Sequence, residues 1–291
     1  MATRVTIDIF SGRPNPTFTL SDRQSREWLG RLRRTPAKGR AEKILPVPEA
    51  TLGYRGMVIE QTGRTIGGLP RAFRVANGDV FAGRAAWRAD SAFEDFVCGS
   101  TGPLGRLKLG RDFPLILVRE IARLREIRLR WPWKRWPWPL KPRCLCAPLY
   151  EPAWWNVPAR QPYNNCYNYG CNYRSDTFAQ PGKAAGAMYS ALSCASVKPA
   201  AVADALIDNP GANNKCPSEG HLVALVIAPG WDFHWYRKGR NGYWSHKPGG
   251  TAVTNLDNSG NLIPDPRTAD RGPYTDFCTF MTVMHGHIKI K

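Results

Sequence analysis

The sequence predicts an α+β protein: a small N-terminal α+β domain, a basic connector, and a C-terminal α+β domain with an antiparallel sheet. Three observations predict this. Polar and apolar residues alternate over Arg4–Phe10, as in a half-buried strand. Ser21 and Gln24 match a capping box, which indicates the start of a helix. Two strand-like runs flank the turn signal Asn241-Gly242, which is typical of a hairpin.

The N-terminal domain is expected to cover residues 1–108. Its predicted elements are a strand at 4–10, a turn at 11–16, a helix from Ser21 through Leu32, a strand at 56–60, a hairpin at 73–81 around Asn77-Gly78, and a helix at 91–97. These residues contain no recognisable catalytic constellation. A structural role is therefore favoured, with binding or regulation as the alternative.

The connector, residues 109–150, is basic and rich in tryptophan and proline. Val118, Ile121, Leu124 and Ile127 recur every third residue among arginines, which predicts a basic amphipathic helix. Residues 119–143 hold nine Lys/Arg and two Glu, a net charge of 9 − 2 = +7. Prolines after residue 131 favour an extended path. The candidate contacts to a membrane or polyanion are Trp131, Trp133, Lys134, Arg135, Trp136 and Trp138.

The partner of this connector is left open. Alternating indoles and cations suit an anionic membrane or cell-wall surface, and nucleic acid is the weaker alternative. The segment also resembles tryptophan- and proline-rich cationic antimicrobial peptides in composition. A linker whose indoles pack on the neighbouring domain is equally compatible.

Charge and composition set the remaining limits. The chain has 41 Lys/Arg and 23 Asp/Glu, a net charge of +18, which suggests an anionic partner. Residues 151–291 carry 13 basic and 10 acidic residues, a net charge of only +3. Most of the positive charge therefore lies in the N-terminal domain and the connector. No secretory signal or membrane-spanning run is recognisable, which predicts a cytoplasmic protein, with signal-independent export as the alternative. Eight cysteines are too sparse for a small disulfide scaffold.

The C-terminal domain, residues 151–291, carries the candidate chemistry. Its predicted elements are a helix beginning at Cys166, a turn at 177–182, helices at 183–195 and 198–207, and strands at 221–228, 232–237, 243–247 and 277–283. His234 and Tyr236 share one face of their strand. Whether His246 lies on that face depends on the register of the hairpin, which the sequence leaves open.

Cys166 is the candidate nucleophile, because two histidines follow it on neighbouring predicted strands. A catalytic thiol needs a base within hydrogen-bond reach, and the base needs an orienting group. His234 and His246 could fill these roles. The amides of Gln161 and Asn165 could support an oxyanion. A helix starting at Cys166 would favour the thiolate.

The order of these residues resembles the papain superfamily, especially its bacterial cell-wall amidase and endopeptidase branch. The resemblance covers about residues 160–250. It implies a papain-like fold with Cys166 as nucleophile, His234 as base and His246 as orienting residue. The surrounding Asn-Asn-Cys-Tyr-Asn-Tyr differs from the usual motifs of that superfamily, which leaves the helix and oxyanion hole open.

Other assignments use the same residues differently. His221 could be the base, with His234 or Asp232 orienting it, and Asp257 is a reserve orienting group. The loop at Asp257 only partly suggests a calcium site, since EF-hand spacing is missing.

Structural roles for the cysteines and histidines are also open. Cys166 could be an inert buried residue. Cysteine pairs 166–171 or 194–216 could form disulfides in an oxidising compartment. Cys166, His234 and His246 could instead bind zinc.

The function predicted from the sequence is cysteine-dependent hydrolysis or acyl transfer at an amide or peptide bond, without a cofactor or resident metal. A non-enzymatic cationic binding protein is the alternative from another class. A cysteine-protease-type toxin or effector is a further alternative with the same chemistry.

Overall fold

A computed structural model describes residues 2–33, 44–48, 50–89, 92–99, 102–107, 109–110, 112–130 and 142–291; the side chains of residues 105, 106 and 130 are not described. The chain separates into two units. The first contains Met1–Ile9, Asn15–Pro48 and Tyr54–Arg130, and the second contains Phe10–Pro14, Glu49–Gly53 and Trp131–Lys291. The second unit therefore includes a five-residue piece, Phe10–Pro14, from near the start of the chain. The predicted domain limits stay predictions.

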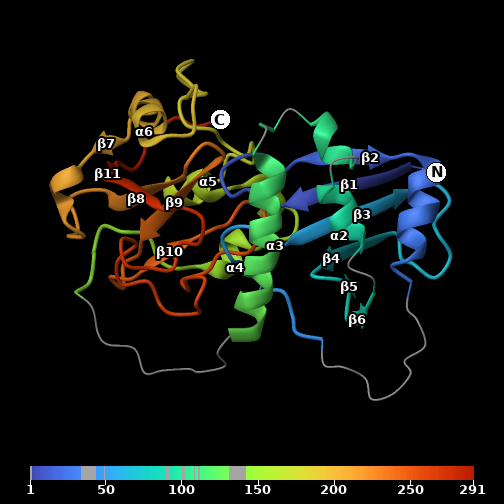
Figure 1. Ribbon diagram of the computed structural model, residues 1–291. Coiled ribbons are helices and arrows are strands. Elements are labelled where there is room, and N and C mark those ends of the chain that lie inside the picture. Colours follow the sequence, from blue (N-terminus) through green and yellow to red (C-terminus); the bar gives the residue numbers. More distant parts are fainter. Residues whose placement is uncertain are drawn as a thin grey trace. The chain divides into compact units, whose positions relative to one another are not determined.

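A six-stranded antiparallel sheet is the framework of the first unit (Figure 1). Its strands are β1 (Ala2–Asp8), β2 (Thr17–Leu20), β3 (Gly56–Thr62), β4 (Ala72–Ala76), β5 (Asp79–Ala82) and β6 (Ala85–Arg88), in the spatial order β2-β1-β3-β4-β5-β6. Val5 and Ile7 of β1 are fully buried, in keeping with the predicted alternation. Asn77 and Gly78 have φ of 52° and 76°, which the predicted turn between β4 and β5 requires. β2 and β6 are missing from the predicted elements, because four residues carry little alternation.

The helical segments of the first unit are α1 (Asp22–Gln24), a π-helical turn (Ser25–Leu29), α2 (Ala92–Cys98), a 3-10 turn (Pro103–Arg106) and α3 (Phe113–Arg130). The predicted capping box at Ser21 and Gln24 is present at the start of α1. The predicted helix in the connector is confirmed as part of α3, but its buried stripe differs from the expected one. Leu117 and Leu124 are buried, whereas Val118 is 52% exposed. Arg128 also faces inward, where it forms a 2.6 Å ion pair with Asp79.

The second unit is built on a five-stranded antiparallel sheet. Its strands are β7 (Ile207–Asp208), β8 (His221–Ala228), β9 (Asp232–Lys238), β10 (Trp244–His246) and β11 (Asp276–Val283), in the spatial order β10-β9-β8-β11-β7. The four strands predicted here are confirmed as β8 to β11. Every residue of β8, β9 and β10 is buried, so these strands form the centre of the unit rather than a solvated surface.

The helical segments of the second unit are α4 (Pro152–Trp155), a 3-10 turn (Gln161–Tyr163), α5 (Cys166–Gly170), α6 (Cys194–Ala203) and a 3-10 turn (Pro210–Ala212). The helix predicted at 183–195 is wrong. Gly182 and Gly186 adopt φ of 76° and 71°, so this alanine-rich segment forms turns. The helix predicted at 198–207 begins earlier, as α6, and stops before Ala205, whose φ is 72°.

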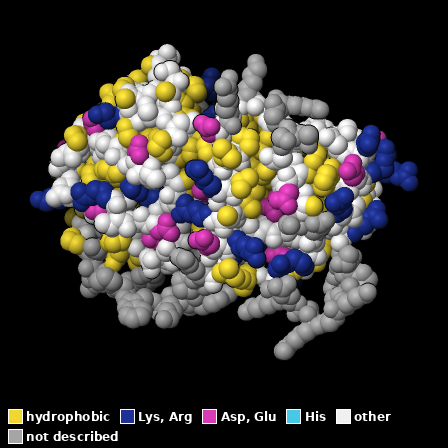
Figure 2. Space-filling view, in the orientation of Figure 1, with side chains coloured by type: hydrophobic (Ala, Val, Ile, Leu, Met, Phe, Trp, Pro, Cys, Tyr) yellow, Lys and Arg dark blue, Asp and Glu magenta, His cyan; other side chains and the backbone are white. Residues whose placement is uncertain are grey.

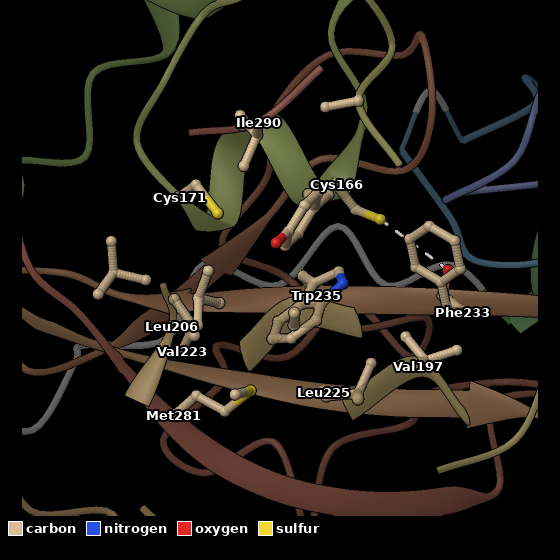
Figure 3. Packing of buried hydrophobic residues seen from close by; sticks show 14 of the residues in the cluster. Cys166, Cys171, Val197, Leu206, Val223, Leu225, Phe233, Trp235, Met281 and Ile290 are labelled. Carbon is tan, nitrogen blue, oxygen red and sulfur yellow. Dashed lines mark hydrogen bonds between the residues drawn. The ribbon is translucent and has the colours of Figure 1, made fainter. Parts of the chain in front are cut away.

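Two disulfides cross-link the second unit: Cys144–Cys216 and Cys194–Cys278. The cysteine pairs considered from the sequence, 166–171 and 194–216, are therefore wrong. Cys166 and Cys171 are free thiols buried in a hydrophobic cluster with Trp235 (Figure 3). Sequence spacing could not reveal the disulfide partners, because they are 72 and 84 positions apart and meet only in the folded chain.

Lys and Arg side chains are dispersed over the face drawn in Figure 2, and Asp and Glu side chains lie among them. The candidate polyanion contacts between Trp131 and Trp138 lie outside the described residues. Among the helices that are described, none is both long and apolar enough to cross a bilayer.

Candidate functional site

Cys166 is the first residue of α5, and the residue before it fixes the start of that helix. The Oδ1 of Asn165 accepts hydrogen bonds from the amides of Tyr167 and Asn168, at 3.0 and 3.1 Å. This is a capping box, completed by the Asn168 side chain. Because α5 has only five residues, its dipole contributes little to the acidity of the thiol.

α5 is held against β9 by close packing. The rings of Tyr167 and Trp235 lie 5.2 Å apart. Gly170 faces the same indole, and a Cβ at this position would lie 3.2 Å from the Cβ of Trp235. The absence of a side chain thus lets the helix lie close enough for Cys166 to meet the backbone of β9.

The Cys166 thiol is fully buried beside this backbone. Its Sγ lies 3.9 Å from the carbonyl oxygen of Phe233, as the dashed line in Figure 3 shows. Burial, and then the negative charge of Asp232, raise the pKa of Cys166, against hydrogen bonds from the Trp235 amide and the Ser11 side chain that lower it. The thiol in this state is therefore protonated at neutral pH.

A chain of hydrogen bonds runs from Ser11 through two imidazoles. Ser11 Oγ lies 2.5 Å from Nδ1 of His234, and Nε2 of His234 lies 2.9 Å from Nδ1 of His246. Nε2 of His246 lies 2.9 Å from the Leu256 carbonyl oxygen. β10 places His246 opposite Tyr236, on the face that carries His234. The register that the sequence left open thus brings the two histidines together.

The last acceptor fixes the direction of these hydrogen bonds. The Leu256 carbonyl can only accept, so Nε2 of His246 carries a proton. Burial lowers the pKa of His246 to about 4, so at neutral pH its Nδ1 is an acceptor. His234 must then donate from Nε2. A neutral His234 that donates from Nε2 accepts at Nδ1 from the Ser11 hydroxyl.

Asp232, at the start of β9, binds the same N-terminal segment. Its carboxylate accepts hydrogen bonds from the amides of Ser11 at 2.5 Å, Gly12 at 3.2 Å and Arg13 at 3.2 Å, and from the hydroxyl of Tyr274 at 2.5 Å. Burial raises the pKa of Asp232 to about 6, although the hydrogen bonds, that of Tyr274 first, lower it. The group is ionised at neutral pH.

The predicted amide donors lie in different places. Asn165 Nδ2 donates to the Gly12 carbonyl at 2.8 Å, next to Cys166. Gln161 Nε2 instead donates to the carbonyl of Gly250 at 3.3 Å. Asn165 is therefore placed to hold a carbonyl oxygen at the site, and Gln161 is engaged elsewhere.

The reserve residues also have other partners. His221 Nε2 donates to the Gly170 carbonyl at 2.7 Å, at the far end of α5 from Cys166. Asp257 accepts from the amides of Ser259, Asn261 and Asp270, which is loop-stabilising geometry. Neither side chain has a hydrogen bond to His234 or His246 among those the structure gives. In the part of the chain that is described, no cluster of three or more His, Cys, Asp or Glu could hold a metal ion.

Sequence reasoning missed two residues of the site, Ser11 and Gln180, and considered Asp232 only as a partner of histidine. Ser11 was part of a turn-forming segment more than 150 positions before Cys166. Its density of Gly, Pro and Asn signals a turn but gives no indication of its partner. Gln180 donates to the Gly12 carbonyl at 2.8 Å, beside the Asn165 amide.

Comparison with known proteins gives one informative relative. The chain is 46% identical over 141 residues to "Insoluble matrix shell protein 1" of Ruditapes philippinarum, a match covering 48% of this chain and 92% of that protein. The chain belongs to the family of this shell matrix protein. No family model and no solved structure matches the chain.

This membership corrects the predicted location. The cytoplasmic assignment is wrong, because the relative is by its name a protein of the insoluble shell matrix and the chain has two disulfides. Disulfides persist in oxidising compartments, whereas cytosolic thiols are kept reduced. The absence of a recognisable signal in residues 1–16 was a poor guide to the compartment.

Proposed function

We propose that the chain is an extracellular cysteine-dependent hydrolase or acyltransferase that acts on amide bonds of peptides, within a secreted matrix. The observation that carries the proposal is the hydrogen-bonded pair His234 and His246, which Ser11 and Gly12 connect to Asn165, the residue before Cys166. His246 accepts from Nε2 of His234 and directs its Nδ1 toward the Ser11 hydroxyl. A base and an orienting group are thus in direct contact, and Cys166 supplies a thiol at the start of the neighbouring helix α5.

The chemistry would follow from this arrangement. Nδ1 of His234 takes the proton of the Cys166 thiol, and the thiolate attacks the carbonyl carbon of the amide. The proton returns from His234 to the leaving amine, which departs as a thioester forms. Water in hydrolysis, or an amine in acyl transfer, then releases the acyl group and restores the thiol. Asn165 Nδ2 would hold the carbonyl oxygen during the attack.

A papain-like relationship is part of this proposal. The order Cys166, His234, His246 along the chain, and the packing of α5 on an antiparallel sheet, support it. The extracellular setting is supported by the two disulfides and by the named location of the relative.

A second candidate function is a structural component of an insoluble matrix. It is favoured by the complete burial of Cys166, His234 and His246, and by the name of the relative. In this case the hydrogen-bond chain only satisfies buried polar groups.

Cleavage of a mixed peptide library separates the two candidates. The wild-type protein and a Gly12→Ala variant, in which a Cβ would clash with the Phe233 ring beside Ser11, are incubated with the library. New termini are identified by mass spectrometry. We expect cleavage that disappears in Cys166→Ala and in His234→Ala. Cys98→Ala is the control, since Cys98 is a free thiol of the first unit, away from the candidate site. Turnover that survives Cys166→Ala, or no turnover in either starting protein, would reject the enzymatic function.

A further inference from the structure

Phe10–Pro14 lies in the second unit with its backbone bound by side chains. The amides of Ser11, Gly12 and Arg13 all donate to the Asp232 carboxylate. The Gly12 carbonyl accepts from Asn165 Nδ2 and from Gln180 Nε2, both at 2.8 Å. A strand of a sheet would pair its amides and carbonyls with another backbone. Here fixed side chains bind them, as a groove binds a peptide ligand.

Two amide groups converge on a single carbonyl oxygen in this arrangement. Asn165 is completely buried and Gln180 nearly so. The Oδ1 of Asn165 caps α5, so its Nδ2 is held in place by the fold rather than by Gly12 alone. Tyr189 donates its hydroxyl to Oε1 of Gln180 at 2.8 Å, which orients the second amide in the same way. Both donors are therefore built into the unit.

Gly12 lies directly against the ring of Phe233. A Cβ on Gly12 would lie 2.3 Å from the ring of Phe233, which is far closer than real Cβ atoms come to neighbours. Phe233 is itself fully buried. The groove thus accepts glycine at this point and excludes any larger residue.

Arg13, the residue after Gly12, is bound through its guanidinium group. Nη1 of Arg13 donates to the Trp231 carbonyl at 2.7 Å, and its guanidinium lies 4.8 Å from the centre of the Phe10 ring. Ser11, on the other side of Gly12, bonds Nδ1 of His234. This is the nitrogen that the proposed reaction needs. The segment therefore occupies the position of a substrate and also blocks the base.

We propose that Phe10–Pro14 is a resident peptide in a peptide-binding groove beside Cys166, and that this groove takes other extended peptides with glycine followed by a cationic residue. Only the cleavage or acyl transfer of such a peptide rests on the proposed function; its binding does not. With the segment in place the site is closed. Displacing it opens the groove and uncovers the thiol.

The test uses the full-length protein and the accessibility of Cys166. Gly12→Ala should expel the segment, because the added methyl has no room beside Phe233. We expect iodoacetamide to label Cys166 at least about tenfold faster in Gly12→Ala than in the wild type. The peptide acetyl-Phe-Ser-Gly-Arg-Pro-Asn-amide, which copies residues 10–15, should protect Cys166 again. The same peptide with alanine for glycine should not.

The outcomes distinguish the groove from the enzyme. If Gly12→Ala keeps its disulfides and its near-ultraviolet circular dichroism but leaves Cys166 unlabelled, the resident-peptide proposal is rejected. If this variant does not fold, Arg13→Ala is used, which loses the bond to Trp231 and should label several times faster than the wild type; unchanged labelling rejects the proposal. If Cys166 is labelled and the peptide protects it, but His234→Ala has no effect on the rate, the groove stands and the catalytic function fails.

Discussion

Nδ1 of His246 lies 2.9 Å from Nε2 of His234, and both imidazoles are completely buried. The two rings are close to perpendicular, with centroids 4.9 Å apart. Since the opposite nitrogen of His246 is bound to the Leu256 carbonyl, His246 has no freedom to turn without breaking a buried hydrogen bond. The ring of His234 is thereby held in one orientation and one tautomer.

Removal of the His246 ring should therefore lower the free energy of unfolding by more than the lost packing alone. His246→Ala leaves the Nε2 proton of His234 without its buried acceptor, which costs about 1–3 kcal/mol in addition to the lost volume. His246→Gln keeps an acceptor oxygen and should be less destabilised. Urea unfolding at pH 7 measures both. His287→Ala, at an exposed position, is the control and should lie within about 0.5 kcal/mol of the wild type. Equal stability of the alanine and glutamine variants would contradict this explanation.

Asp232→Asn should destabilise the second unit by about 2–4 kcal/mol. The carboxylate accepts from three backbone amides and from the Tyr274 hydroxyl, and an asparagine offers one oxygen and two additional N–H donors to these four donors. Asp276→Asn, at an exposed residue of β11, is the matched control. The free energies of unfolding of the two variants are compared in urea; a difference below about 0.5 kcal/mol would show that the carboxylate is not needed.

The buried histidine His221 should make stability fall in acid. Burial lowers the pKa of His221 to about 3, although the Gly170 carbonyl raises it. In the unfolded chain the same group titrates near pH 6.5. Between these values the unfolded state binds one more proton, so this group's contribution is fully present above about pH 6.5 and is lost as the pH falls toward 3. The expected slope is about 1.4 kcal/mol per pH unit.

His221→Gln isolates this effect, because the other titrating groups remain in both proteins. Urea unfolding at pH 7, 6 and 5 should show the wild type losing its advantage over the variant as the pH falls. A difference that stays constant across these pH values would mean that His221 has the same pKa in the folded and the unfolded protein, and would contradict the prediction.

The disulfides should be the largest single contributions to the stability of the second unit. They close segments of 72 and 84 residues, for which loop-closure entropy gives about 4 kcal/mol each. Cys194→Ala with Cys278→Ala should lower the free energy of unfolding by this order. Cys146→Ala, which alters an exposed free thiol, should leave it nearly unchanged. Equal midpoints in urea with and without a reducing agent would contradict the prediction.

Much of the fold could be predicted from local sequence signals. The Ser21 capping box, the Asn77-Gly78 turn and the hairpin around Asn241-Gly242 are each defined by a few neighbouring residues, and each is present. The prediction of an alanine-rich helix at 183–195 was wrong because Gly186 inside this range, and Gly182 just before it, adopt left-handed backbone angles. The helix propensity of alanine is small, and tertiary context overrides it.

The candidate site could be predicted only in its C-terminal part. His234 and His246 lie on adjacent strands of one hairpin, so their proximity depends on local register. Ser11 and Gly12 come from a distant segment that meets them only in the folded chain. The two disulfides likewise join cysteines that are distant in the sequence. Long-range contacts of this kind follow from the packing of whole elements, which single-sequence patterns do not contain.

The two disulfides overlap along the chain, one joining residues 144 and 216 and the other joining 194 and 278. Any single backbone cut between 144 and 278 therefore leaves two fragments that are still covalently joined. A protease that nicked an exposed loop in this span would release no piece of the second unit until a reductant was also present. In an oxidising compartment, where disulfides persist, such nicking would therefore leave the two fragments together.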